Sequence, residues 1–262
     1  MDTFGTGGDK RHTFNISTIS AFVAAGAGAV VAKHGNRAVS SKCGSADLLK
    51  ELGVNIEAKA EVVEKCLNQI GIAFLFAPLL HASMKYAAPV RREIGIRTIF
   101  NILGPMTNPA CARHHLLGVF NEQITKTLAN SLAELGSRHV LVVCGKDGLD
   151  EITTTAESVI SELKNGRVKT YTVKPGDFGI KKAKPVDLKG ADCAFNAKLT
   201  MDLLNGKKGP QRDIIVLNAG AALYASDIAK DIKTGISLAE ESIDTKSAMR
   251  KLEQLKGMTN EV

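Results

Sequence analysis

The first half of the chain alternates short apolar runs with stretches whose apolar residues recur at helical spacing. Runs of β-favouring apolar residues predict buried strands, and apolar positions three and four residues apart predict helices packed on a core. The predicted strands cover residues 29–32, 72–76, 116–120 and 139–143, and the predicted helices cover residues 17–25, 46–52, 60–70 and 123–135. Gly53, Gly71 and Gly136 stand where three of these helices would end in the left-handed conformation that glycine favours. This alternation favours an α/β domain with a mostly parallel sheet.

Two later regions depart from the alternation. Residues 78–95 have a helical pattern that Pro89 interrupts, which predicts an excursion away from the sheet. Asn165-Gly166 is typical of the tight turn of a β-hairpin, and the chain from residue 192 onward is mainly helical. The hairpin strands are expected at residues 158–163 and 168–173, and C-terminal helices at residues 194–204, 214–224 and 244–256.

The composition fits a folded protein with an aliphatic core. Of the 262 residues 44% are hydrophobic, only 5% are aromatic and Trp is absent, and this length suits one large domain or two modest ones. The uncharged segment 13–32 contains too many Asn, Ser, Thr and Gly residues for a membrane span. We expect no signal peptide before it, and the five cysteines form no C-x-x-C pair. We expect a cytoplasmic protein without membrane contact, disulfide framework or zinc site.

A net charge of +7 favours an anionic partner but does not identify it. Lys and Arg are scattered along the chain, with no long basic run and no interleaved aromatic residues of the kind that bind single-stranded nucleic acid. The distribution therefore disfavours nucleic acid and leaves phosphorylated small molecules as candidates.

The strongest local motif is a glycine cluster, Gly5-Thr-Gly-Gly8-Asp9, directly after a short predicted strand, followed by Asn15-Ile-Ser-Thr18 at the start of a helix. Glycines let backbone N–H groups converge on phosphate oxygens, and a helix start adds further free N–H donors. The pattern is neither a dinucleotide fingerprint nor a Walker A loop. A tight turn with an ordinary helix cap explains the same residues, so the motif alone leaves both interpretations open.

A second polar cluster runs from Lys33 to Ser41, after the predicted strand 29–32. Ligands bind at the carboxyl ends of strands in open α/β sheets, and Lys33 and Arg37 would offer charge to phosphates. A solvated basic loop is the alternative. His34 has no carboxylate beside it in sequence, which favours a structural histidine over a general base.

Two further loops add compatible chemistry. Gly44-Ser45 opens the next predicted helix and offers a hydroxyl and backbone amides. Asp150 and Glu151 follow the predicted strand 139–143, and adjacent carboxylates with substrate phosphate oxygens are typical Mg²⁺ ligands. Most such acidic pairs are merely solvated loop residues, but a pyrophosphate site needs a cation to offset its charge.

Taken together, these motifs resemble the anthranilate phosphoribosyltransferase family of tryptophan biosynthesis. The resemblance extends in order over nearly all of the chain and includes Phe74-Leu-Phe-Ala-Pro78, Arg91, Arg97-Thr-Ile-Phe-Asn-Ile-Leu-Gly-Pro105 and Asn108-Pro109 in addition to the motifs above. It implies transfer of the phosphoribosyl group of 5-phosphoribosyl 1-pyrophosphate (PRPP) to the amine of anthranilate, with Mg²⁺ as cofactor. The implied fold is a nucleoside phosphorylase-like α/β core, formed by residues 1–77 and 100–262, with the remnant of a small helical domain at residues 78–99.

The resemblance also implies site residues. Anthranilate would meet Gly5, Asn36 and Arg91, and Arg91 would otherwise be a plain surface cation. Mg²⁺ would be held through Ser17, Asp150 and Glu151. PRPP would lie against Gly5, Gly8, Asp9, Thr13, Asn15, Ile16, Ser17, Thr18, Lys33, His34, Gly35, Asn36, Arg37, Ala38, Val39, Ser40, Ser41 and Ser45.

One departure from the family pattern concerns the start of the chain. Family members carry an N-terminal helical segment before the first strand, whereas here the glycine cluster begins at Gly5. We expect a truncated or unusually short chain in which PRPP binding is kept, anthranilate transfer is impaired and the family homodimer is lost or replaced. The alternatives are a pyrimidine-nucleoside phosphorylase, which would want a different motif in place of Lys33 to Arg37, and a nucleic-acid-binding relative of the fold.

Overall fold

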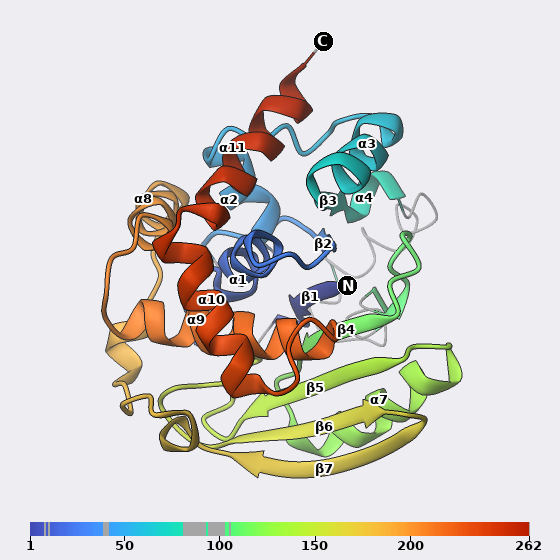
Figure 1. Cartoon of the computed structure of the whole chain (residues 1–262), viewed down its shortest axis with the longest axis vertical. Helices are drawn as coiled ribbons and strands as arrows, with labels where there is room; N and C mark the ends of the chain where they lie inside the picture. The colour runs from blue at the N-terminus through green and yellow to red at the C-terminus, as the bar shows by residue number, and fades with distance from the viewer. Residues whose placement is uncertain are drawn as a thin grey trace.

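The computed structural model describes residues 1–7, 9, 11–38, 42–80, 93, 103–104 and 106–261. Among these residues, most strands pair in parallel and helices pack around them (Figure 1). The strands are β1 (Asp2–Gly5), β2 (Val31–Gly35), β3 (Ile72–Phe76), β4 (His114–Gly118), β5 (His139–Gly145), β6 (Ser158–Lys164) and β7 (Arg167–Val173). The α-helices are α1 (Ile16–Gly26), α2 (Ser45–Glu51), α3 (Ala60–Ile70), α4 (Ala77–Leu80), α7 (Thr125–Glu134), α8 (Cys193–Leu204), α9 (Pro210–Ala225), α10 (Ile232–Asp244) and α11 (Ser247–Asn260).

The larger sheet has the strand order β1-β4-β5-β6-β7. β1, β4 and β5 are parallel, and the β6–β7 hairpin adds two antiparallel strands at one side. β2 and β3 form a separate parallel pair. A hydrogen bond from the amide of Ala32 to the carbonyl of Met1, 2.9 Å long, brings β2 alongside β1. The carboxyl ends of β1 and β2 therefore lie close together.

Helices cover both faces of the larger sheet. α7 packs on one side against β5, β6 and β7, while α9 packs against β4 and β5 and is itself covered by α1 and α10 (Figure 1). The segments of α9 and α1 that face the core are almost wholly apolar and buried, which follows from their position between layers. At the crossing of α9 and α10, Gly220 and Gly235 are in contact, and a Cβ on either one would overlap the backbone of the other helix.

Several sequence predictions are confirmed closely. The strand 72–76 and the helix 60–70 have the predicted bounds. Asn165 and Gly166 have φ values of 52° and 71°, as a hairpin turn with both central residues left-handed requires. Gly71 is the left-handed C-cap of α3, with φ 71°. Together with the parallel strand pairs, these elements confirm an α/β fold with a mainly parallel central sheet.

Three expectations need correction or lie outside the described residues. The second strand was expected at residues 29–32, but β2 begins at Val31 and continues through Lys33 and His34 to Gly35. Helix α10 was not predicted as a separate element. Of the helical segment predicted at 78–95, only residues 78–80 and 93 are described. No helix in the described part of the chain is both long and apolar enough to cross a membrane.

Candidate functional site

The glycine cluster lies against the acidic loop that follows β5. β1 ends at Gly5, and the amide of Gly7 donates a 2.7 Å hydrogen bond to Asp150 Oδ2. A Cβ at Gly5 would collide with the Asp150 carboxylate, and a Cβ at Gly118, at the end of β4, would collide with the Asp150 backbone carbonyl. Glycine is required at both positions because the two loops are in direct contact. The structure thus brings together two motifs that are more than a hundred residues apart in sequence.

The acids of this loop are buried, which corrects the expectation that they are exposed. Asp150 is 9% and Glu151 6% exposed. Burial, followed by the nearby charge of Asp9, raises the pKa of Asp150 to about 7. Burial and then the charge of Asp150 raise the pKa of Glu151 well above its usual value, although Lys33 and the amide of Ser17 oppose this shift. Two acids are therefore buried together, where ionising both of them is unfavourable.

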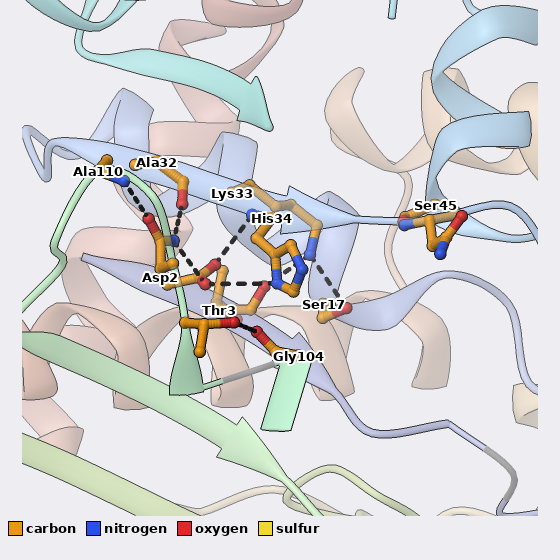
Figure 2. A network of polar contacts seen from close by, with 12 residues as sticks. Asp2, Thr3, Ser17, Ala32, Lys33, His34, Ser45, Gly104 and Ala110 are labelled. Atoms are coloured by element: carbon orange, nitrogen blue, oxygen red, sulfur yellow. Dashed lines mark hydrogen bonds and ion pairs between the residues drawn. The ribbon is translucent and has the colours of Figure 1, made fainter. Parts of the chain in front are cut away.

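Lys33 is a buried cation whose charge acts on Glu151, and its position differs from the expected polar loop. It lies within β2 and is 4% exposed. Its ammonium donates to the carbonyl of Thr3 at 2.6 Å and lies 3.5 Å from Ser17 Oγ (Figure 2). Burial lowers the pKa of Lys33, while the charges of Asp2 and Glu151 oppose this effect. The ammonium is held at the start of α1, beside Glu151, and is not part of a solvated loop.

His34 is a buried residue on the same strand, as a structural histidine would be. Its amide donates to Asp2 Oδ1 at 3.1 Å, and its ring packs edge-on against Phe4 at 5.6 Å between centroids. A carboxylate is nonetheless close in space, because His34 Nδ1 lies 4.0 Å from Asp2 Oδ2. Asp2 also accepts a 2.7 Å hydrogen bond from Asn108, so its charge serves a buried network (Figure 2).

Asp47 of α2 binds the described residues on both sides of the segment that follows β2. One oxygen of Asp47 accepts from the amides of Ala38 and Gly44, at 2.8 and 3.0 Å. Arg37 directs its guanidinium to Glu57 at 3.4 Å and to Asp47 at 3.6 Å. In this structure Arg37 therefore balances protein carboxylates.

Asn36 and Ser45 connect the two ends of that loop. The amide of Asn36 donates to Ser45 Oγ at 3.3 Å, and the Ser45 hydroxyl lies 3.2 Å from the Asn36 carbonyl. Gly35 precedes them because a Cβ there would collide with Ser45 Oγ and crowd the ring of Phe74.

The start of α1 differs from an ordinary helix cap. Asn15 is the N-cap residue, but its side chain makes no capping hydrogen bond and donates instead to the Cys43 carbonyl at 3.0 Å. Ile16 and Thr18 are each 1% exposed, so their side chains are not available to a ligand. Thr13 forms an isolated antiparallel bridge with Lys189.

Two buried asparagines near the site were not identified from the sequence. Asn196 of α8 donates to Asn15 Oδ1 at 3.2 Å. Asn218 of α9 binds both backbone groups of Ile152, accepting at 3.0 Å and donating at 2.9 Å, directly after the acidic pair. An amide side chain on the apolar face of a helix was the available signal, since such groups are buried only with partners.

The predicted residues that the structure describes lie in or after β1 and β2, after β5, and at the starts of α1 and α2. Gly8, Val39, Ser40, Ser41 and Arg91 lie outside the described residues.

The side chains present fit a hard cation that also binds phosphate. No group of three or more His, Cys, Asp or Glu side chains within the described ranges is arranged to hold a metal by itself. Asp150 and Glu151, buried near Ser17, instead supply an incomplete oxygen shell of the kind that Mg²⁺ completes with water and substrate phosphate oxygens. A cation would also offset the charge of the confined acids.

Comparisons with known proteins agree with this geometry. The family model for the a/b domain of the glycosyl transferase family matches residues 1–249. Anthranilate phosphoribosyltransferase from Desulfosudis oleivorans is 56% identical over 256 residues, which cover 97% of this chain and 76% of the relative.

Solved structures are similarly close. The crystal structure of the enzyme from Thermus thermophilus matches with a TM-score of 0.94 and 43% identity, over 99% of this chain and 78% of that one. The enzyme from Saccharomyces cerevisiae in complex with PRPP and Mg matches with a TM-score of 0.90 and 30% identity, over 100% of this chain and 74% of that one. With its fold, its motifs and these matches, the chain belongs to the anthranilate phosphoribosyltransferase family.

Proposed function

We propose that this chain binds Mg²⁺-PRPP at the carboxyl ends of β1, β2 and β5 and transfers the phosphoribosyl group to the amine of anthranilate. The products are N-(5-phosphoribosyl)anthranilate and pyrophosphate. The observation that carries the assignment is the contact between the glycine cluster and the buried acids, where Gly7 binds Asp150. A phosphate cradle and a cation-binding pair there face a single substrate. Related enzymes are solved with PRPP and Mg and with 4-fluoroanthranilate.

The backbone amides of Gly7 and Ser17 are the donors that we assign to the pyrophosphate. The amide of Gly7 donates a 2.7 Å hydrogen bond to Asp150, and the amide of Ser17 opposes the rise in the pKa of Glu151. The two carboxylates would hold the cation, phosphate oxygens would accept from these amides, and the start of α1 would add its partial positive charge.

The remaining residues position the reactants. Displacement of pyrophosphate from C1 of the ribose develops positive charge on the ring, so no strong nucleophile is required from the protein. Mg²⁺ supplies electrostatic stabilisation of the departing pyrophosphate. Lys33, fixed by the Thr3 carbonyl, places its amino group at the start of α1. Asn36 and Ser45 hold the next loop beside it.

For anthranilate we assign Gly5, Asn36 and Arg91, and for the domain organisation we keep residues 78–99 as a helical unit beside the PRPP-binding core. A guanidinium suits the anthranilate carboxylate because it can donate two parallel hydrogen bonds. Arg91→Ala should raise the anthranilate KM about tenfold or more, with PRPP binding nearly unchanged. Equal weakening of both substrates would make Arg91 a structural residue.

The proposed reaction is tested by measuring anthranilate consumption with PRPP at a series of Mg²⁺ concentrations, together with calorimetric titration of Mg²⁺-PRPP. A parallel assay for phosphorolysis of pyrimidine nucleosides covers the other enzyme class, which the named relatives do not favour. We expect PRPP-dependent consumption and no phosphorolysis. Phosphorolysis without PRPP turnover, or no binding of Mg²⁺-PRPP, would refute the proposal.

A further inference from the structure

Asn196 of α8 reaches the proposed PRPP cradle through a chain of side-chain amides. The amide of Ala191 donates to Asn196 Oδ1 at 3.1 Å, and Asn196 Nδ2 donates to Asn15 Oδ1 at 3.2 Å. Asn15 Nδ2 in turn donates to the carbonyl of Cys43 at 3.0 Å. Asn196 is 3% exposed, so water is a poor substitute for these partners.

The direction of the chain is fixed by its two ends. The backbone N–H of Ala191 can only donate, and the backbone carbonyl of Cys43 can only accept. Reversing the amide of Asn196 or Asn15 would place two donors or two acceptors face to face. The oxygen and nitrogen of both side chains are therefore determined by the network itself, as reliable amide assignment requires.

The helix that carries Asn196 is held firmly at its start. Asp192 caps α8 by accepting from the amide of Phe195 at 2.9 Å, and it accepts the amide of Asn196 through its carbonyl at 3.0 Å. One turn later Thr200 Oγ1 donates to the Asn196 carbonyl at 2.7 Å. Asn196 thus presents its side chain to Asn15 from a fixed backbone.

We propose that Asn196 is a positioning residue for PRPP, acting through Asn15. Asn15 precedes α1, and Cys43 precedes Gly44-Ser45 at the start of α2, so the amide of Asn15 joins two of the loops assigned to PRPP. The hydrogen bond from Asn196 to Asn15 Oδ1 orients the Asn15 amide so that its Nδ2 faces the Cys43 carbonyl. One of the two Nδ2 hydrogens of Asn15 bonds to the Cys43 carbonyl, and the other one does not. This inference rests on the proposed function, because it assigns PRPP to these loops.

The test compares Asn196→Ala and Asn196→Asp with Leu203→Val, a control two turns along α8 whose side chain is 1% exposed. In Asn196→Asp a carboxylate oxygen would face Asn15 Oδ1, and turning Asn15 over would only move the conflict to the Cys43 carbonyl. For both Asn196 variants we expect the PRPP KM to rise about tenfold, the equivalent of one well-placed hydrogen bond. The anthranilate KM at saturating PRPP should stay within about twofold.

A double-mutant cycle separates positioning from general destabilisation. In an Asn15→Ala background, Asn196→Ala should change kcat/KM for PRPP by less than about twofold, because the path through Asn15 is already broken. Calorimetric titration with Mg²⁺-PRPP and thermal melts accompany each variant. Leu203→Val should lower the melting temperature and leave the PRPP KM unchanged.

Each contrary result has one meaning. Equal losses for both substrates, a matching PRPP defect in Leu203→Val, or full additivity in the cycle would make Asn196 a residue of the fold only. Loss of cooperative unfolding in both Asn196 variants would overturn the inference in the same way. If the unsubstituted protein failed to bind Mg²⁺-PRPP, the proposed function would fail first and this inference with it.

Discussion

The two edges of the central sheet, at the carboxyl and the amino ends of its parallel strands, differ in how their buried acids are stabilised. At the carboxyl ends of the parallel strands, Asp150 and Glu151 are buried side by side, and the pKa of each is raised by burial and by neighbouring acids. At the opposite edge, His139 begins β5 between two acids, with Nδ1 2.7 Å from Asp227 and Nε2 3.2 Å from Glu162.

At the opposite edge, Glu162 has protein hydrogen-bond partners. Tyr224 donates a 2.6 Å hydrogen bond to the same oxygen of Glu162 that His139 contacts. Burial alone would raise the pKa of Glu162, but hydrogen bonds from His139, Tyr224 and Tyr171 outweigh it and the pKa is lowered. One edge thus stabilises ionised Glu162 with protein partners, while the other buries two acids whose ionisation a cation would favour. We infer that the first edge serves the fold and the second serves the ligand.

Replacing both acids should break this comparison most strongly. Asp150→Asn with Glu151→Gln removes the proposed cation ligands, so we expect turnover of PRPP to fall on the order of 100-fold or more. Without Mg²⁺ the double variant should melt at or above the temperature of the unsubstituted protein, because repulsion between buried acids is relieved. Rates across a Mg²⁺ series and melts with and without Mg²⁺-PRPP test both parts. Unchanged rates would remove these residues from the site.

His139→Ala should produce the reverse pattern. Glu162 and Tyr224 would lose a buried partner, which we expect to cost about 2–4 kcal/mol of unfolding free energy. kcat and both KM values should hold at a temperature where the variant is folded, since His139 lies at the other edge of the sheet. Urea denaturation and steady-state kinetics provide the measurements. A large kinetic defect in a fully folded variant would contradict the division between the edges.

A single methyl group at the acidic loop should affect both properties. Gly118→Ala places a Cβ against the Asp150 backbone carbonyl, and we expect a loss of about 1–3 kcal/mol in stability together with weaker PRPP turnover. Gly176→Ala is the matched control, because a Cβ at Gly176 would have no atom within 4 Å. Equal behaviour of the two variants in denaturation and kinetics would show that the loop contact is loose.

The smallest expected effect is a pH dependence of stability at the edge that contains Glu162. A group whose pKa is lowered by folding stabilises the protein above its unfolded pKa, about 4.3 for Glu, and loses that contribution as the pH falls through the folded value. The difference in unfolding free energy between the unsubstituted protein and Glu162→Gln should therefore be full at pH 7, about 1 kcal/mol, and shrink below about pH 4. Denaturation curves at several pH values measure it. A difference that stays constant down to pH 3 would mean that Glu162 gains nothing from its partners.

Much of the fold was predictable because local sequence determines it. The helix 60–70, the strand 72–76 and the turn at Asn165-Gly166 follow from apolar spacing and glycine chemistry within a short window. The second strand was misplaced because Lys33 looks like the start of a polar loop. Its ammonium is accommodated by the carbonyl of Thr3, thirty residues away in sequence, and local pattern does not report such a partner.

The proximity of two predicted motifs was predictable from the sequence, whereas their electrostatics were not. Motif order indicated that the glycine cluster and the acidic pair belong together, and the Gly7 to Asp150 hydrogen bond agrees. Burial of Asp150 and Glu151 depends on the close approach of Gly5 and Gly118, which only the folded chain shows. The side-chain amides of Asn196 and Asn218 come from C-terminal helices, in which no sequence motif indicated them.

The contact between the glycines of α9 and α10 affects the position of the acidic loop. Asn218 holds the backbone of Ile152 and sits on α9 two residues before Gly220, which touches Gly235 across the helix crossing. Any side chain at Gly235 would push the two helix axes apart. Because Asn218 hydrogen-bonds both backbone groups of Ile152, a displacement of α9 would also displace the acidic pair. The position of the acidic pair therefore depends on the absence of side chains at Gly220 and Gly235.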